Sequence, residues 1–255
     1  MKNLVNSDGI RRKIMEITLI NKWLVDGVRF TFFTTEKVLD HAFWWQSLAG
    51  SEPDSVVSRS LKGEFSYVGT LGNSNLELNI FPDRIDWILK TKPEEGLLEP
   101  FIGEYDTCVS DFVAKIDNWL NGITNIFNRF AFGVSIYHPV ESKIDGYKEI
   151  YELLPFLPLV KGEWNDFFLQ FNKQKTIVIN SEEVLLNRIM NFGVAQMQFI
   201  NIQNTTNVMS KLFTRIEFDI NTHINNRNEF TSSEVKKIIP FLTDIPSALN
   251  SASEV

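Results

Sequence analysis

The sequence contains a single cysteine, Cys108, among its 255 residues. One cysteine excludes an internal disulfide and a zinc site built from several thiolates. No apolar run approaches the roughly 18 residues that a membrane-spanning helix needs. Residues 1–10 also lack the apolar core of a signal peptide. We therefore expect a cytoplasmic protein without a membrane partner, which folds around an ordinary hydrophobic core.

Positive charge is scarce as well, since 25 basic residues face 32 acidic ones and the formal net charge is -7. The one tight basic cluster is Arg11-Arg12-Lys13. Proteins that bind nucleic acid mainly through its phosphates usually carry a basic excess or a dense basic patch. The composition therefore disfavours extended nucleic-acid binding.

The motifs of common enzyme and cofactor sites are missing. There is no phosphate-binding loop, no glycine-rich dinucleotide loop, no serine nucleophile elbow and no paired-histidine zinc motif. The three histidines, His41, His138 and His223, lie far apart and share no metal-ligand spacing. The sequence thus indicates no cofactor and favours a protein that acts by binding, such as an adaptor.

Two-residue alternation of apolar and polar side chains dominates the chain and is typical of strands with one buried face. Asp26-Gly27 reads as a hairpin turn between two such strands. A change of parity at Phe81-Pro82 indicates a bulge or bend inside a longer strand. The expected strands cover residues 15–25, 28–32, 56–70, 75–89, 129–136, 167–171, 194–202 and 212–221, and residues 181–192 fit either a helix or a strand.

Helical spacing marks four further segments, each with a plausible cap or stop signal. They begin near Thr34, Asp106, Ser142 and Thr231, and the last opens with the capping box Thr231-Ser232-Ser233-Glu234. Short connections between strands favour an α+β fold with mainly antiparallel sheets and helices packed on one face. Residues 91–104 read as a linker between an N-terminal half (1–90) and a C-terminal half (105–255). The order strand–helix–strand–strand occurs once in each half, so two similar halves are an open alternative.

Arg84 and Asp86 lie on one face of a predicted strand, where they form either an ion pair that stabilises the sheet or a clamp for a ligand. Arg129 precedes small residues at 131, 133 and 135 on its own face. Such small side chains allow a helix, another backbone or an anion to approach the arginine closely. Arg188, with polar neighbours at 170, 172 and 187, is a third candidate for contact with a partner's backbone or a nucleotide.

Trp44 and Trp45 are adjacent in a predicted helix, so their side chains point about 100° apart. Both are buried only if the helix is covered on two sides. Otherwise one ring is exposed and marks a surface for a protein partner or for self-association.

Glu217 and Asp219 support an alternative function. Alternate positions of one strand place their carboxylates roughly 7 Å apart on the same side. Two carboxylates at this spacing are able to share a divalent metal ion or to divide acid and base roles. The alternative is therefore a hydrolase that acts on nucleotides or phosphoesters, whereas the simpler interpretation is a solvated outer sheet face.

Four short segments, at 45–50, 76–87, 168–172 and 186–189, resemble a sporadically distributed family of uncharacterised bacterial proteins. The second segment ends in Pro-Asp-Arg-Ile-Asp-Trp. The family has no assigned activity, so the resemblance implies no catalytic residue. Its patchy distribution is of the kind that accompanies mobile elements and phage conflict. The resemblance therefore implies a bacterial protein in that setting, without saying what it binds.

Overall fold

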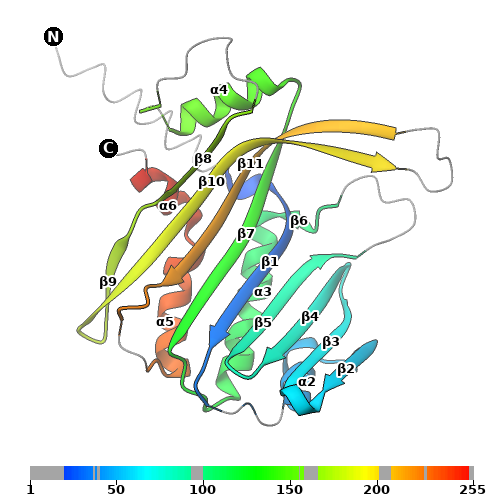
Figure 1. Cartoon of the computed structure of the whole chain (residues 1–255), viewed down its shortest axis with the longest axis vertical. Helices are drawn as coiled ribbons and strands as arrows, with labels where there is room; N and C mark the ends of the chain where they lie inside the picture. The colour runs from blue at the N-terminus through cyan, green and yellow to red at the C-terminus, as the bar shows by residue number, and fades with distance from the viewer. Residues whose placement is uncertain are drawn as a thin grey trace.

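One antiparallel sheet organises the computed structural model (Figure 1), which describes residues 20–36, 38, 41–92, 100–154, 156–157, 166–200, 208–226 and 229–252. The strands are β1 (Leu24–Phe33), β2 (Ser55–Arg59), β3 (Glu64–Leu71), β4 (Ser74–Phe81), β5 (Arg84–Thr91), β6 (Gly103–Glu104), β7 (Arg129–Val140), β8 (Phe168–Asn172), β9 (Lys175–Ile179), β10 (Glu182–Ile200) and β11 (Val208–Thr222). Across these described residues the sheet has 11 strands, in the order β2-β3-β4-β5-β1-β7-β11-β10-β8, while β6 pairs with β1 and β9 with β10. The predicted antiparallel α+β fold is confirmed.

The helices pack against one face of the sheet. They are α2 (His41–Ala49), α3 (Tyr105–Asn121), α4 (Lys143–Leu153), α5 (Ser232–Thr243) and α6 (Ile245–Ala252), with the short 3-10 turns η1 (Ile20–Lys22) and η2 (Ser60–Lys62). Ser142 caps α4 by accepting a hydrogen bond from the Asp145 amide, and α5 begins with the predicted capping box of Thr231 and Glu234. Figure 1 looks onto the opposite face, with α3 and α5 behind the strands.

Aromatic side chains fill the space between the sheet and the helices. Phe30 and Phe32 of β1 point toward α3, where they contact Phe112 and Trp119 at ring-centroid distances of 5.8 and 5.0 Å. The alternate residues of β1 therefore point to the other face. This alternation leaves a polar sheet face that no helix of the described chain covers.

Trp44 and Trp45 are both in this core, with exposed fractions of 3% and 1%. Trp45 stacks between Tyr67 and Trp87, and Trp44 meets Trp119 edge to face. Helix α2 is therefore covered on two sides. The expectation that one of these rings is exposed as an interaction surface is wrong.

Two turn assignments from the sequence are also wrong. Asp26-Gly27 does not end a strand, because β1 runs through it with a shift of register between Val25 and Val28. A side chain at Gly27 would begin 3.1 Å from the Leu89 carbonyl oxygen, so glycine permits the close approach of β5. Conversely, Pro82 lies in the tight turn that joins β4 to β5, where we expected a bend within one strand.

The ambiguous segment 181–192 is extended and belongs to the long β10. Its neighbour β9 was not predicted, because Ile177, Val178 and Ile179 are three consecutive apolar residues without two-residue alternation. Strand β10 lies between β9 and β11, and β11 confirms the alternation predicted for residues 212–221.

The two predicted halves contribute to one sheet and one core. Strand β1, from the first half, lies between β5 and β7, and β7 comes from the second half. Trp87 and Trp119, from opposite sides of the proposed linker, meet at 5.7 Å. Residues 93–99 of that linker lie outside the described residues, and the division at 91–104 stays a prediction.

Candidate functional site

The polar face of the sheet brings three arginines together from three neighbouring strands. The register places Phe33 of β1 beside Arg84 of β5 on one side and Arg129 of β7 on the other. Arg29 lies four residues earlier on the same face of β1. Since alternate residues of a strand share a face, all three guanidinium groups project from the side without helices.

These arginines line a cavity of about 160 Å³. Its walls are Arg29, Thr31, Phe33, Arg84, Asp86, Arg129, Ala131 and Asp219. The cavity thus unites Arg84, Asp86, Arg129 and Asp219, which the sequence suggested as separate candidates. Arg29 is the member that sequence reasoning missed. Arg29 alternates with the buried Phe30, which places Arg29 on the polar face. Only the strand order shows that Arg29 lies near Arg84 and Arg129.

A buried carboxylate holds the first arginine in place. Asp86 accepts a hydrogen bond of 2.7 Å from the Thr31 hydroxyl on the neighbouring strand. Its other oxygen lies 3.0 Å from Arg84 Nε, an ion pair whose angle falls short of a hydrogen bond. The Arg84 guanidinium also lies over the Phe81 ring, 4.3 Å from its centroid. The ion pair expected from sequence is therefore present, and Asp86 largely neutralises Arg84.

Neutral groups orient the second arginine. Arg129 donates from Nε to the Thr222 carbonyl oxygen at 3.2 Å and from one terminal nitrogen to Asn221 Oδ1 at 3.3 Å. Its guanidinium lies 5.3 Å from the centre of the Phe33 ring. Asn221 in turn donates to Asp219 Oδ1 at 2.9 Å. Arg129 is thus fixed in orientation by groups that do not cancel its charge.

The third arginine is available to a ligand. Arg29 is exposed and makes no hydrogen bond or salt bridge to any residue that the structure describes. Its guanidinium lies over Gly133 of β7, where a Cβ would sit 3.3 Å from Arg29 Nη2. Gly133 is one of the small residues predicted to allow a helix, another backbone or an anion to approach Arg129, and in the structure it makes room for the side chain of Arg29.

The charges and the size of this site restrict what it binds. Three guanidinium groups and two carboxylates line it, which gives +3 − 2 = +1 in a chain of net charge -7. Arginine offers planar, paired donors that match a carboxylate or phosphate. The cavity is smaller than the roughly 300 Å³ at which pockets for whole small molecules begin. It suits one anionic group better than an entire nucleotide.

The two carboxylates of the metal hypothesis have different partners. Glu217 Oε2 lies 3.0 Å from Arg215, whereas Asp219 accepts from Asn221 and faces the three arginines. No group of three or more histidine, cysteine or acidic side chains placed to hold a metal ion occurs in the described part of the chain. The proposed metal pair is thus divided between two polar networks.

Glu217 belongs to a second network beside the arginine cavity. The Tyr137 hydroxyl donates to Asp26 at 2.8 Å, and Arg215 donates to the Tyr137 oxygen at 3.2 Å. Burial raises the pKa of the Tyr137 phenol to about 12, and the neighbouring Asp26 carboxylate acts in the same direction. Burial also raises the pKa of Asp26. Tyr137 is therefore a neutral structural donor at physiological pH.

Arg188 does not join the arginine cavity. It is 4% exposed and its neighbours in β10 show that it points to the helix side of the sheet. Its Nε donates to the Lys173 carbonyl oxygen at 3.1 Å, and burial lowers its pKa. Asn172 and Asn187 hydrogen-bond to each other on the opposite face. The polar cluster expected around Arg188 is thus not formed, because Arg188 lies on one face of the sheet and Asn172 and Asn187 lie on the other.

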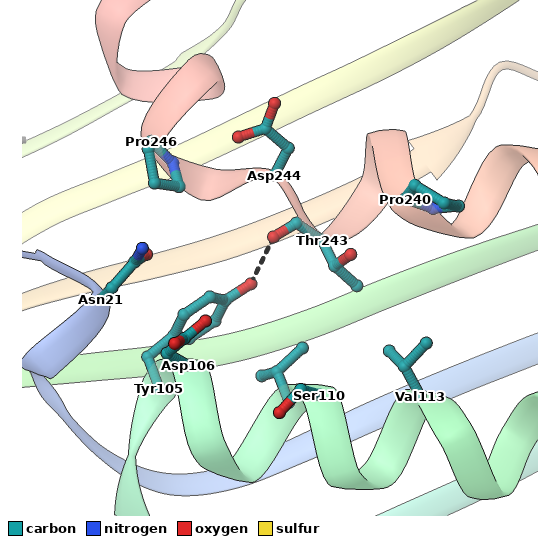
Figure 2. A pocket seen from close by; sticks show the side chains of 10 residues that line it. Asn21, Tyr105, Asp106, Ser110, Val113, Pro240, Thr243, Asp244 and Pro246 are labelled. Carbon is teal, nitrogen blue, oxygen red and sulfur yellow. Dashed lines mark hydrogen bonds between the residues drawn. The ribbon is translucent and has the colours of Figure 1, made fainter. Parts of the chain in front are cut away.

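A larger cavity, of about 370 Å³, lies on the helix side between η1, α3, α5 and α6 (Figure 2). The Tyr105 hydroxyl points into it and donates to the Thr243 carbonyl oxygen at 2.6 Å. Burial raises the pKa of Tyr105 well above its usual value. The charged residues in its lining, Asp106 and Asp244, are both acidic. None of the residues proposed from sequence lines this cavity.

Comparison with known proteins adds no assignment to this geometry. No protein-family model matches the chain, and no curated protein matches it significantly. Among the described helices, none is long and apolar enough to cross a membrane. We therefore infer the function from the site itself.

Proposed function

We propose that this protein is a binding module whose uncovered sheet face recognises a protein partner by receiving one of its carboxylates between Arg29 and Arg129. The observation that carries the proposal is that three arginines line one small cavity. The positive charge of each arginine is neutralised to a different extent by its neighbours. Asp86 engages Arg84, neutral acceptors orient Arg129, and Arg29 has no partner among the described residues.

The net charge of the site favours a carboxylate over a phosphate. A carboxylate carries one negative charge, which equals the net +1 of the lining. A phosphate monoester carries close to two negative charges at neutral pH, and Asp86 and Asp219 would repel the second. A carboxylate bound by two guanidinium groups leaves Asp219 as an acceptor for a neighbouring N–H of the partner.

A protein partner fits the surroundings of the cavity. The face continues on both sides as rows of polar side chains, including Ser66 and Asn79 on one side and Asn187 and Asn191 on the other. Such a surface offers hydrogen bonds around a charged anchor, as interfaces between proteins do. A role of this binding in mobile-element or phage conflict stays a prediction from the resemblance.

The experiment is an NMR titration of the ¹⁵N-labelled protein with acetate and, separately, with inorganic phosphate. We expect acetate to shift amide signals of β1, β5 and β7 around the cavity, with weaker effects from phosphate at equal concentration. Stronger phosphate binding at the same residues would overturn the choice of a carboxylate. Acetate shifts scattered over the surface, or absent, would overturn the site.

A further inference from the structure

The edge of the sheet at β2 carries exposed apolar side chains on both of its faces. β2 is the last strand on the path of the sheet, and all five of its residues are exposed. Val56 and Val57 point to opposite faces and are 51% and 55% exposed. Leu61, in the turn that follows, is exposed as well. Proteins usually protect such an edge with charge, proline or a covering element.

We propose that β2 pairs antiparallel with β2 of a second copy of this chain, forming a two-fold dimer with one continuous sheet. The two-fold axis of such a dimer is perpendicular to the sheet, so residues that face each other must share a face. The register that pairs all five residues is centred on Val57. It places Val57 opposite Val57, Val56 opposite Ser58, and Ser55 opposite Arg59 of the second copy.

The charges at the two ends of β2 favour this antiparallel arrangement. Acidic Glu52 and Asp54 precede the strand, whereas basic Arg59 and Lys62 lie at its end and just beyond. Arg59 lies 3.2 Å from Glu64 of β3, so the positive charge at this end comes mainly from Lys62. Antiparallel pairing brings the acidic end of one copy to the basic end of the other, twice by symmetry. Parallel pairing would bring like charges together. The strand is thus complementary to itself, which favours a second copy over an unrelated strand.

The other edge of the sheet consists of β8 and β9, and neither strand has large apolar side chains exposed on both faces. In β8, Phe168 is 66% exposed, but Leu169 and Phe171, on the other face, are only partly exposed. In β9, exposed Val178 lies between buried Ile177 and Ile179, as in a strand with one face on the core. Helix α5 also contacts this strand. Val178 therefore offers a control position, because it is a valine exposed to a similar extent as Val57. It lies on a strand that we expect to remain outside the interface.

The dimer would place both helix-free faces, and hence both arginine cavities, on the same side of the continuous sheet. This follows from the direction of the two-fold axis and does not depend on what the cavities bind. Five residue pairs make a small interface, and interfaces of this kind dissociate readily. We therefore expect dissociation on dilution.

Sedimentation velocity over a wide range of protein concentration tests the proposal. The unmodified chain should shift from one chain toward two as concentration rises, and Val57→Lys should weaken the dimer by about tenfold or more, because two lysines would oppose each other. Val178→Lys should leave the equilibrium unchanged. Three results would overturn the proposed dimer. They are a monomer at every concentration, dimerisation of Val57→Lys as strong as that of the unmodified chain, and equal weakening of the dimer by Val57→Lys and Val178→Lys. Circular dichroism verifies that each variant is folded.

Cross-linking tests the register. In a Cys108→Ser background, Val57→Cys should link to itself with a bifunctional thiol reagent that reaches about 5 Å, the spacing of directly opposed residues. Ser55→Cys should not, because its two copies would lie four residues apart along the strands, roughly 13 Å. Efficient linking of Ser55→Cys together with failure of Val57→Cys would contradict the register.

Discussion

Thr31 and Asp86 form a buried hydrogen bond between β1 and β5, with 2.7 Å between the Thr31 hydroxyl and Asp86 Oδ1. This contact lies on the polar face of the sheet, where most other side chains are partly exposed. It directs the remaining oxygen of Asp86 toward Arg84. The pair therefore determines which of the three arginines is neutralised within the chain.

Replacing Asp86 should separate its structural and electrostatic roles. Asp86→Ala leaves the buried Thr31 hydroxyl without its acceptor and should lower the free energy of unfolding by about 1–3 kcal/mol in urea denaturation. Asp86→Asn keeps an acceptor oxygen and should cost less. Because it also removes a negative charge from the cavity, Asp86→Asn should bind acetate more tightly than the unmodified protein. Unchanged or weaker acetate binding by this folded variant would argue against the electrostatic account.

Gly133→Ala should weaken acetate binding with little loss of stability. The added Cβ would lie 3.3 Å from Arg29 Nη2, the mobile end of a long side chain, so the arginine is expected to move rather than the sheet. We expect the free energy of unfolding to change by less than about 0.5 kcal/mol. Gly193→Ala is the matched control, since its Cβ would meet only the Phe167 carbonyl oxygen at 3.5 Å. Equal acetate affinities for the two variants would contradict the placement of Arg29.

Sequence patterns predict the faces of the strands well, because side-chain direction depends only on local alternation. Arg84 and Asp86 were expected to share a face and to form either an ion pair or a clamp for a ligand, and they form an ion pair at 3.0 Å. The alternation from Arg215 to Asn221 likewise gives the correct polar face. The capping box at Thr231 is another local signal that the structure confirms.

The assembly of the cavity depends on strand order, which local patterns do not contain. Arg84 and Arg129 come together because β1 lies between β5 and β7. Asp-Gly pairs often form hairpin turns, but Asp26-Gly27 lies within β1 at a shift of the register between β1 and β7. Gly27 fits there because it allows β5 to approach closely. Burial of Trp44 and Trp45 likewise depends on the distant Trp87 and Trp119.

His138 should make stability depend on pH near neutrality. It lies 2.8 Å from Glu149 of α4 and stacks on Trp23. The hydrogen bond to Glu149 raises the pKa of His138, against the opposing effect of burial. Protonated His138 therefore stabilises the fold below the unfolded-state pKa of about 6.5, and this contribution is lost as pH rises through the higher folded-state pKa.

Urea unfolding of the unmodified protein and of His138→Gln at several pH values measures this contribution. The stability advantage of the unmodified protein should be largest near pH 5.5 and should shrink toward pH 8.5, which lies about two units above the ordinary histidine pKa. An advantage that grows with pH would show that the assigned direction is wrong.

Titration with Mg²⁺ or Mn²⁺ distinguishes the binding function from the hydrolase alternative. Because Glu217 pairs with Arg215 and Asp219 faces the arginine cavity, we expect no cation affinity that depends on both carboxylates. Calorimetry of the unmodified protein, Glu217→Gln and Glu64→Gln provides the comparison, since Glu64 is an acidic residue on β3 away from both networks. A sub-millimolar site abolished by Glu217→Gln alone would support the hydrolase.

The most direct test of the binding account is the acetate affinity of three arginine variants, measured by the same NMR titration. Arg29→Ala and Arg129→Ala each remove one of the guanidinium groups proposed to hold the carboxylate. Arg59→Ala removes an arginine on β2 that pairs with Glu64 outside the cavity. We expect Arg29→Ala and Arg129→Ala each to weaken acetate binding by about tenfold or more, whereas Arg59→Ala should bind acetate as the unmodified protein does. Equal acetate affinity in all three folded variants would contradict this expectation.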